Sequence, residues 1–300
     1  MLTNEILYLI QLVIAGLTIG SLYSLIGLGF VLIYKATSIL NFAEGEAMTL
    51  GAYFCYVLII SAKLPSIIAV ILTILFLALV GIVSEALLMR PMLGESTLPI
   101  VMITIGLSIS FQSAISIIFG HDNVAFPVFF SKEQIQIMPG LSISMTQIWI
   151  ILITTSLFII FYLMFKYTKI GLAMRATAND QESSYLMGVD IKRIFSQTWG
   201  LSFIVAGIAG IFLAHVTNIS PSFSLIAIRV FPVIVLGGME SIVGAIIGGM
   251  LIGVTENIVG GYFDELLGGG AKDLTAFIIL LLVLIIKPHG LFGIKKIERV

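Results

Sequence analysis

The residues of this chain with the greatest potential for chemistry are carboxylates that stand in apolar surroundings. Glu44 and Glu46 occur in the segment NFAEGE, which begins at Asn41 and lies between two apolar stretches, and Glu240 occurs in GGMES. A charge at the centre of a membrane helix costs at least about 2.5–3.5 kcal/mol, so such side chains usually face a cavity or a partner. These positions therefore indicate a path for a polar solute or a site of ion coupling.

Two interpretations of these carboxylates remain open from the sequence. In one, NFAEGE is a kink that lines a translocation path together with Gly237, Gly238 and Glu240. In the other, it is an interfacial loop whose carboxylates touch water, because the depth of a charge in the bilayer decides its cost. The sequence does not give the depth of Asn41–Glu46.

The sequence contains no motif that indicates a metal site, a catalytic site or an ATP-binding site. The histidines His121, His215 and His289 are scattered singly, without a spacing suited to a metal, and Cys55 is the single cysteine. The sequence has no GxSxG, HExxH or CxxC motif and no Walker-type GxxxxGK[ST] loop. The look-alike LLGGGAKD, which ends at Asp273, fails the Walker spacing. We therefore expect no catalytic residue, no metal and no cofactor on this chain, and no ATP site of its own.

The composition places the chain in a bilayer. Of its 300 residues 59% are hydrophobic and only 10% are charged, whereas a soluble domain carries about 25% charged residues. The formal net charge of −1 argues against nucleic acid as a partner. The first residues, MLTNEILYLI, have no basic region and no small-residue cleavage pattern, so we interpret them as a retained first helix.

Apolar stretches predict an all-α integral membrane protein, a polytopic bundle of about eight transmembrane helices. A spanning helix needs roughly 20 mostly apolar residues. The eight candidates are Ile6–Tyr34, Ala47–Ser61, Pro65–Met89, Pro99–Phe119, Ile148–Phe165, Phe195–Val216, Phe231–Val259 and Leu274–Ile286. The second and the last are short, and the second could begin within NFAEGE. With no linker visible, residues 1–300 are predicted to form one transmembrane domain.

The positions of basic residues predict the orientation, since cytoplasmic loops are enriched in Lys and Arg. Nine of the 15 basic residues lie in two regions, which are therefore expected to be cytoplasmic: Lys166, Lys169, Arg175, Lys192 and Arg193 in one, and Lys287, Lys295, Lys296 and Arg299 in the other. The connection His121–Gln147 holds only Lys132 and is expected to be external.

This orientation conflicts with eight spans, because three spans between the two basic regions would place them on opposite sides. The segment whose number of spans is in question is Ser220–Val259, because Pro221, Pro232 and the pair Gly237-Gly238 break it. It could hold a half-helix, a turn and a full helix, and broken helices at membrane depth are tolerated where they are buried or line a cavity. Elsewhere, glycines such as Gly16 and Gly20 predict close helix packing.

A polar loop, Gly171–Val189, interrupts the apolar pattern and predicts a docking surface. Its alanines favour a helix, Asn179-Asp180 interrupts that helix, and Asp180 followed by Glu182 is typical of the cap and first turn of a second helix. A helix–turn–helix outside the membrane could insert into a groove of a soluble subunit. The alternative is a solvated connection without a partner.

The order of several motifs resembles the LivH-type permeases of branched-chain amino acid ABC importers, over nearly the whole chain. The resemblance rests on GLTIGSLYSLIGLGFVLIYKATSILNFAEGEAMTLGAY from Gly16 to Tyr53, the pair Arg90-Pro91, GLAMRATANDQESSYLMGVDIKRI, LSFIVAGIAGIFLA, VLGGMESIVGAIIGG and the terminal KPHGLFG. One departure concerns Glu44, where many relatives carry histidine, and it adds a carboxylate near the expected path.

The resemblance implies a permease subunit of the bacterial or archaeal cell membrane. It implies a second related permease subunit, two cytoplasmic ATPase subunits that bind ATP, an extracytoplasmic substrate-binding protein and membrane lipid as partners. The coupling loop would occupy about residues 166–194. Its proposed contacts are Gly171, Arg175, Ala176, Ala178, Asp180 and Gly188.

The resemblance further implies alternating access driven by ATP, with leucine, isoleucine and valine as substrates. Permeases for urea or short amides are an alternative, because their motifs are similar to those of the branched-chain amino acid permeases. A secondary transporter that uses Glu44, Glu46 or Glu240 for ion coupling is the other alternative. A membrane-embedded enzyme would need a clustered set of reactive groups, and none is visible.

Overall fold

The structure, a computed structural model, describes residues 2–92, 95–127, 133–266, 268–287 and 289–293. Its residues form two compact units. The first unit comprises Met1–Gly27, Val128–Phe158 and Arg229–Val300, and the second comprises Leu28–Pro127 and Ile159–Ile228. The prediction that residues 1–300 form a single domain stays a prediction.

Two long helices contribute residues to both units, α1 (Leu2–Thr37) and α5 (Met145–Tyr167). The first unit adds two strands and three helices: β1 (Gln134–Met138), β2 (Leu141–Ser144), α10 (Phe231–Gly237), α11 (Ile242–Phe263) and α12 (Ala271–Ile286). The second unit adds α2 (Glu44–Ile60), α3 (Ser66–Ser84), the π-helical turn η1 (Glu85–Met89), the 3₁₀ turn η2 (Arg90–Met92), α4 (Thr97–Phe119), α6 (Lys169–Asn179), α7 (Gln181–Leu186), α8 (Ile191–Val216), η3 (Pro221–Ser224) and all but the last residue of α9 (Leu225–Arg229).

The prediction of a polytopic all-α membrane protein is confirmed. Within the described residues, 6 helices are long and apolar enough to cross a membrane: those of α1, α3, α4, α5, α8 and α11. Each of the eight predicted apolar segments contains a helix, and the two predicted to be short are α2 and α12, with 17 and 16 residues. As the sequence allowed, α2 begins within NFAEGE, at Glu44.

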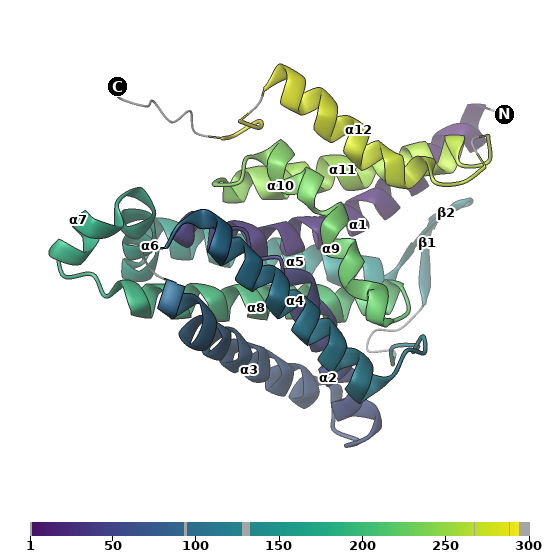
Figure 1. The fold of residues 1–300 in the computed structure, drawn as a ribbon. Coiled ribbons are helices and arrows are strands. Elements are labelled where there is room, and N and C mark those ends of the chain that lie inside the picture. The colour runs from purple at the N-terminus through teal and green to yellow at the C-terminus, as the bar shows by residue number, and fades with distance from the viewer. Residues whose placement is uncertain (1, 93–94, 128–132, 267, 288, 294–300) are drawn as a thin grey trace. The chain divides into compact units, whose positions relative to one another are not determined.

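Helix α8 forms the core of the second unit by packing against both α2 and α3. Its side chains Trp199 and Phe203 are fully buried. Close approach to α2 depends on paired glycines, since a Cβ on Gly51 would lie 2.7 Å from the Cα of Gly207. Figure 1 shows α3 running beside α8.

The first unit contains a similar glycine contact between α1 and α11. A Cβ on Gly16 would lie 2.6 Å from the Cα of Val254, and one on Gly20 would lie 2.8 Å from the carbonyl oxygen of Gly249. In a lipid bilayer the hydrophobic effect does not drive helices together, so close packing at small residues contributes to their association. The prediction that these glycines serve packing is confirmed.

The predicted break in Ser220–Val259 is also present. Short helices η3, α9 and α10 precede a turn at Gly238, which has φ +96°, and α11 follows as a full helix. The amides of Leu291 and Phe292 donate to the carbonyl oxygens of Leu236 and Gly237, at 2.7 and 3.1 Å. The segment after α12 therefore satisfies carbonyl groups at the end of α10.

The sequence analysis did not predict the hairpin of β1 and β2. The strands pair antiparallel, with Gln134 opposite Ser144, around a turn at Gly140 with φ +91°. Four of the basic residues on which the predicted membrane orientation rests, Lys132, Lys295, Lys296 and Arg299, lie outside the described residues. The orientation of the chain in the membrane therefore stays a prediction.

Candidate functional site

The segment NFAEGE folds as a turn that leads into the first turn of α2. The side-chain oxygen of Asn41 accepts from the amide of Ala43 at 3.1 Å, which makes the short local turn typical of asparagine. The Asn41 amide group also donates to Glu44 Oε2 at 3.4 Å. Asn41 therefore holds both the backbone and the first carboxylate of the helix.

The Glu44 carboxyl group meets Ser202 of α8. The Ser202 hydroxyl lies 2.7 and 2.9 Å from the two carboxylate oxygens and 2.8 Å from the carbonyl oxygen of Gly29 on α1. A hydroxyl has a single proton to donate, so it serves one of these acceptors at a time. This cluster of Glu44, Ser202 and Gly29 joins α1, α2 and α8 of the second unit.

The site is buried, and its fit depends on glycine. Glu44 is 0% exposed and Glu46 is 6% exposed. A Cβ on Gly29 would collide with the Glu44 carboxylate, so glycine makes room for it. Both carboxylates are therefore buried within the chain, and the depth of Asn41–Glu46 in the bilayer is a separate question.

The other predicted path residues form a separate feature in the first unit. Gly237 ends α10, Gly238 follows in a left-handed conformation, and Glu240 is half-buried in the turn before α11. The structure therefore describes the six predicted path residues as two sites, one in each unit, and the path itself stays a prediction.

Two further polar clusters involve residues whose partners the sequence did not identify. In the second unit the fully buried Glu85 pairs with Arg90 at 3.0 Å, and Ser196 of α8 bonds to both. In the first unit the hydroxyl of Tyr23 on α1 donates to Glu256 on α11 at 3.1 Å. Both clusters join helices, as polar side chains between membrane helices commonly do.

The predicted helix–turn–helix is present as α6 and α7, which lie between α5 and α8 in the chain (Figure 1). Gly171 packs against the end of α5, since a Cβ there would lie 2.5 Å from the carbonyl oxygens of Met164 and Phe165. The Arg175 guanidinium donates to the Phe165 carbonyl oxygen at 2.6 Å. These contacts fix α6 against α5, while Ala176 and Ala178 are half-buried along it.

Asp180 caps α7, as predicted, and Gly188 ends the turn after it. The Asp180 carboxylate accepts from the amide of Ser183 at 3.1 Å and from its hydroxyl. The bonds from the Ser183 hydroxyl and then from its amide lower the pKa of Asp180, because they favour the charged form. Gly188 adopts φ +86°, the left-handed conformation in which glycine commonly ends helices.

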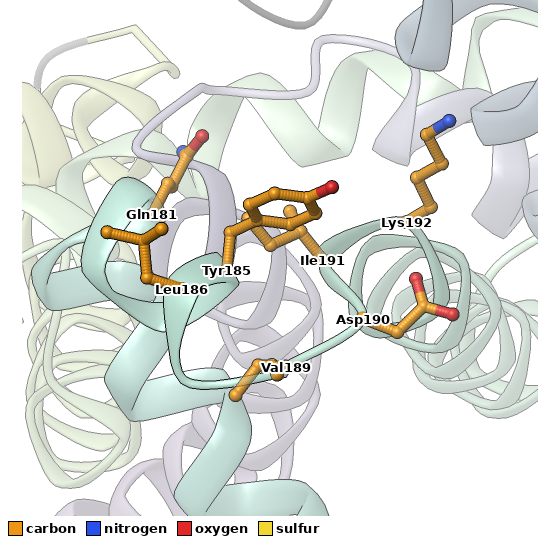
Figure 2. A pocket seen from close by; sticks show the side chains of 8 residues that line it. Gln181, Tyr185, Leu186, Val189, Asp190, Ile191 and Lys192 are labelled. Atoms are coloured by element: carbon orange, nitrogen blue, oxygen red, sulfur yellow. The ribbon is translucent and has the colours of Figure 1, made fainter.

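An open groove of about 830 Å³ lies along α7 and the start of α8. Its walls include Gln181, Tyr185, Val189 and Lys192, and Figure 2 shows Gln181, Tyr185 and Lys192 extending toward the same side of the chain. Tyr185 and Leu186 of this wall are 70% and 78% exposed, and Met187, which follows them, is 86% exposed. Exposed apolar side chains gathered with polar ones are typical of protein interaction sites.

A metal site needs several ligating side chains that lie close together. The described part of the chain contains no group of three or more His, Cys, Asp or Glu residues that could hold a metal ion. The buried carboxylates instead bond to hydroxyl, amide or guanidinium groups of neighbouring helices.

Comparison with known proteins decides the family. The model of the family described as "Branched-chain amino acid transport system / permease component" matches residues 12–287. The chain belongs to this permease family. The permease is 29% identical to the high-affinity branched-chain amino acid transport system permease protein LivH of Salmonella typhimurium over 314 residues, which cover 100% of both chains.

Other relatives match this permease over a similar extent. It is 30% identical over 309 residues to the permease protein BraD of Pseudomonas aeruginosa, with 99% of each chain covered. It is 29% identical over 308 residues to the probable permease protein LivH of Methanocaldococcus jannaschii, with 96% of this chain and 95% of the relative covered. The resemblance found in the sequence is therefore confirmed, and the permease is a multi-pass membrane transport protein.

A solved structure shares the fold of the permease. PsaBC from Streptococcus pneumoniae in complex with Fab has a TM-score of 0.51 with 14% identity, covering 94% of this chain and 92% of that chain. At this identity the likeness concerns the fold alone.

Proposed function

We propose that this permease is the membrane-spanning subunit of an ATP-binding-cassette importer for branched-chain amino acids, with ATP hydrolysed on separate subunits. Membership of the family supports the transport class. The observation that carries the rest is the exposed end of α7, where Tyr185, Leu186 and Met187 stand beside the groove.

The shape of this region suits a docking element. Asp180 and Gly188 define both ends of α7, and Gly171 and Arg175 hold α6 against α5. A rigid pair of short helices transmits motion better than a loose connection, because packed elements shift between discrete arrangements. ATP binding to two ATPase subunits would move this pair and switch the permease between outward-open and inward-open states.

The partners of this proposal are two cytoplasmic ATPases, a second related permease and an extracytoplasmic binding protein, all at a bacterial or archaeal cell membrane. The permease needs few polar contacts to its substrate, since the binding protein selects it. This agrees with buried carboxylates that bond between helices of their own unit.

A matched pair of leucines tests the docking surface. Leu186 and Leu266 are both 78% exposed, but only Leu186 lies in α7. We expect Leu186→Asp to lower ATPase association by about tenfold or more, because charge is depleted from the core of protein interfaces. Leu266→Asp should leave association unchanged. The measurement is recovery of the ATPase subunits with the tagged permease.

Two outcomes with these leucine variants would contradict the proposed docking surface. Equal recovery of ATPase with Leu186→Asp and with Leu266→Asp would remove α7 from the docking surface. Loss of ATPase with both variants would indicate a general effect of added charge and would equally contradict the proposal.

A further inference from the structure

The bend between α5 and α6 carries an exposed group of cationic and aromatic side chains. Tyr162, Lys166 and Tyr167 lie near the end of α5, and Lys169 is the first residue of α6. All four are exposed, and all four belong to the second unit. We call this group the elbow cluster.

The ammonium group of Lys166 packs against both tyrosines of the elbow cluster. Its Nζ lies 5.5 Å from the ring centroid of Tyr162 and 5.2 Å from that of Tyr167. It also donates to the Tyr162 hydroxyl at 3.4 Å. A lysine has three protons to donate, and a tyrosine hydroxyl has one. Even with one proton directed at each tyrosine, the ammonium group keeps one for an acceptor outside the chain.

The positive charge of the elbow cluster lacks a counter-charge in the described part of the chain. Neither Lys166 nor Lys169 forms an ion pair with a carboxylate there, and α5 and α6 contain no Asp or Glu. The two lysines are three residues apart, so their Cα atoms lie within about 11 Å of each other. Lysine has a long, flexible stem. Both ammonium groups can therefore reach one anion.

The surroundings of the elbow cluster indicate that this anion belongs to a lipid. Helix α5 is long and apolar enough to cross a membrane, and the cluster stands at its end. In the turns before it, Ile159, Ile160 and Leu163 are 55%, 58% and 46% exposed. Tyrosine is enriched at membrane interfaces, where its ring is apolar and its hydroxyl meets the headgroups. The cluster therefore combines donors for a phosphate with apolar surface for acyl chains.

We propose that the elbow cluster binds the headgroup of an anionic phospholipid. Lys166 and Lys169 pair with the phosphate, which lysine binds as a point charge. The hydroxyls of Tyr162 and Tyr167 donate to the phosphate oxygens, and the acyl chains lie along the exposed apolar residues of α5. The ligand class follows from the charge and the position of these side chains, and it does not depend on how transport is driven.

A lipid at this position restrains the attachment of the helical pair α6 and α7. The chain already fixes the bend, because Gly171 packs against the end of α5 and Arg175 donates to the Phe165 carbonyl oxygen. A headgroup that pairs with Lys166 of α5 and with Lys169 of α6 adds a further link across the same bend.

Native mass spectrometry of the full chain measures this binding directly. The chain is delipidated in a neutral detergent and titrated with phosphatidylglycerol, or with phosphatidylcholine of the same acyl chains, whose headgroup has no net charge. We expect phosphatidylglycerol to bind with the lower Kd. Lys166→Gln and Lys169→Gln should each raise the Kd for phosphatidylglycerol by about fivefold, the effect expected of one basic side chain near an anionic lipid surface.

Matched variants separate the cluster from a general effect of charge. Lys63→Gln removes the same charge from the exposed connection between α2 and α3 and should leave the Kd unchanged. Tyr162→Phe combined with Tyr167→Phe keeps both rings and removes both hydroxyls, so it should raise the Kd by about threefold through lost hydrogen bonds. Circular dichroism and size-exclusion elution verify that each variant is folded.

Four results would overturn the lipid site. Equal Kd values for phosphatidylglycerol and phosphatidylcholine would remove the role of charge. Equal effects of Lys166→Gln and Lys63→Gln would indicate a response to net charge alone. Displacement of bound phosphatidylglycerol by glycerol 3-phosphate would assign the cluster to a soluble phosphate. Loss of ATPase recovery with Lys166→Gln and Lys169→Gln, at an unchanged Kd for phosphatidylglycerol, would assign these lysines to a protein partner.

Discussion

At the scale of single residues, the Glu44 cluster explains how a carboxyl group is held in an apolar bundle. Its oxygens face the Ser202 hydroxyl and the Asn41 amide, and Gly29 leaves room for it. An isolated buried charge is costly unless it is paired and hydrogen-bonded. Removing a single donor should therefore have a measurable effect on stability.

We predict that Ser202→Ala destabilises the protein by about 1–3 kcal/mol, the cost of leaving a buried acceptor without its donor. Thermal unfolding of the protein in detergent measures the change. Ser156→Ala is the matched control, because the Ser156 hydroxyl is exposed and bonds only to the Leu152 carbonyl oxygen of its own helix. A Ser202→Ala variant as stable as Ser156→Ala would show that Glu44 does not depend on Ser202.

A second prediction at this scale concerns pH and the cap of α7. Hydrogen bonds from Ser183 lower the pKa of Asp180 in the folded protein. The stabilisation of α7 by this cap is therefore present above the unfolded pKa of about 3.9 and is lost as pH falls through the lower, folded value. Hydrogen exchange at the Ser183 amide should accelerate over that acidic range, relative to its intrinsic rate.

Asp180→Asn provides the control for the pH prediction. Asparagine caps helices as well as aspartate does and does not titrate. The variant should keep the Ser183 amide protected at all pH values tested. Acid-dependent exchange that is the same in Asp180→Asn would place the titrating group elsewhere.

At the scale of elements, the sequence predicted the parts that depend on local pattern. The apolar segments, the break near Gly238 and the cap at Asp180 each follow from residues close together in the chain. The sequence could not identify Ser202 as the partner of Glu44. A serine in a helix rich in small residues does not indicate which residue of another helix it contacts. The same holds for Ser196 beside Glu85.

The hairpin was missed for a different reason. Gln134 and Gln136 alternate with isoleucines before a Pro139-Gly140 turn, a pattern typical of a β-hairpin. In the connection His121–Gln147, the sequence interpretation rested only on the scarcity of basic residues. Period-two alternation would have identified it.

The glycine contact between α1 and α11 gives the prediction at the element scale. Gly20→Ala places a methyl group 2.8 Å from backbone atoms at Gly249 and Met250, which cannot move aside as a side chain can. We expect a loss of about 1–3 kcal/mol of stability from overpacking. Thermal unfolding provides the measurement.

Gly106→Ala is the matched control, since nothing lies within 4 Å of a Cβ there. It should leave stability unchanged or raise it by up to about 1 kcal/mol, because alanine favours helix over glycine. A Gly20→Ala variant that behaves like Gly106→Ala would contradict the close packing of α1 on α11.

At the scale of the whole molecule, the permease combines apolar helices with the short helical pair α6 and α7, for which we propose docking to a soluble partner. Its family membership gives the transport class, and 6 long apolar helices within the described residues give the membrane bundle. The proposal adds the energy source and the substrate. The exposed end of α7 is the observation on which the proposed ATPase docking rests.

The measurement that tests this account most directly is leucine uptake into proteoliposomes that hold the permease with its co-purified partners, with the partners identified by mass. The account predicts two ATPases and a second permease, and uptake that needs enclosed ATP and the binding protein and that withstands ionophores. Recovery of the permease alone, with leucine uptake driven by an ion gradient and abolished by ionophores, would contradict the account and assign the energy coupling to the buried carboxylates.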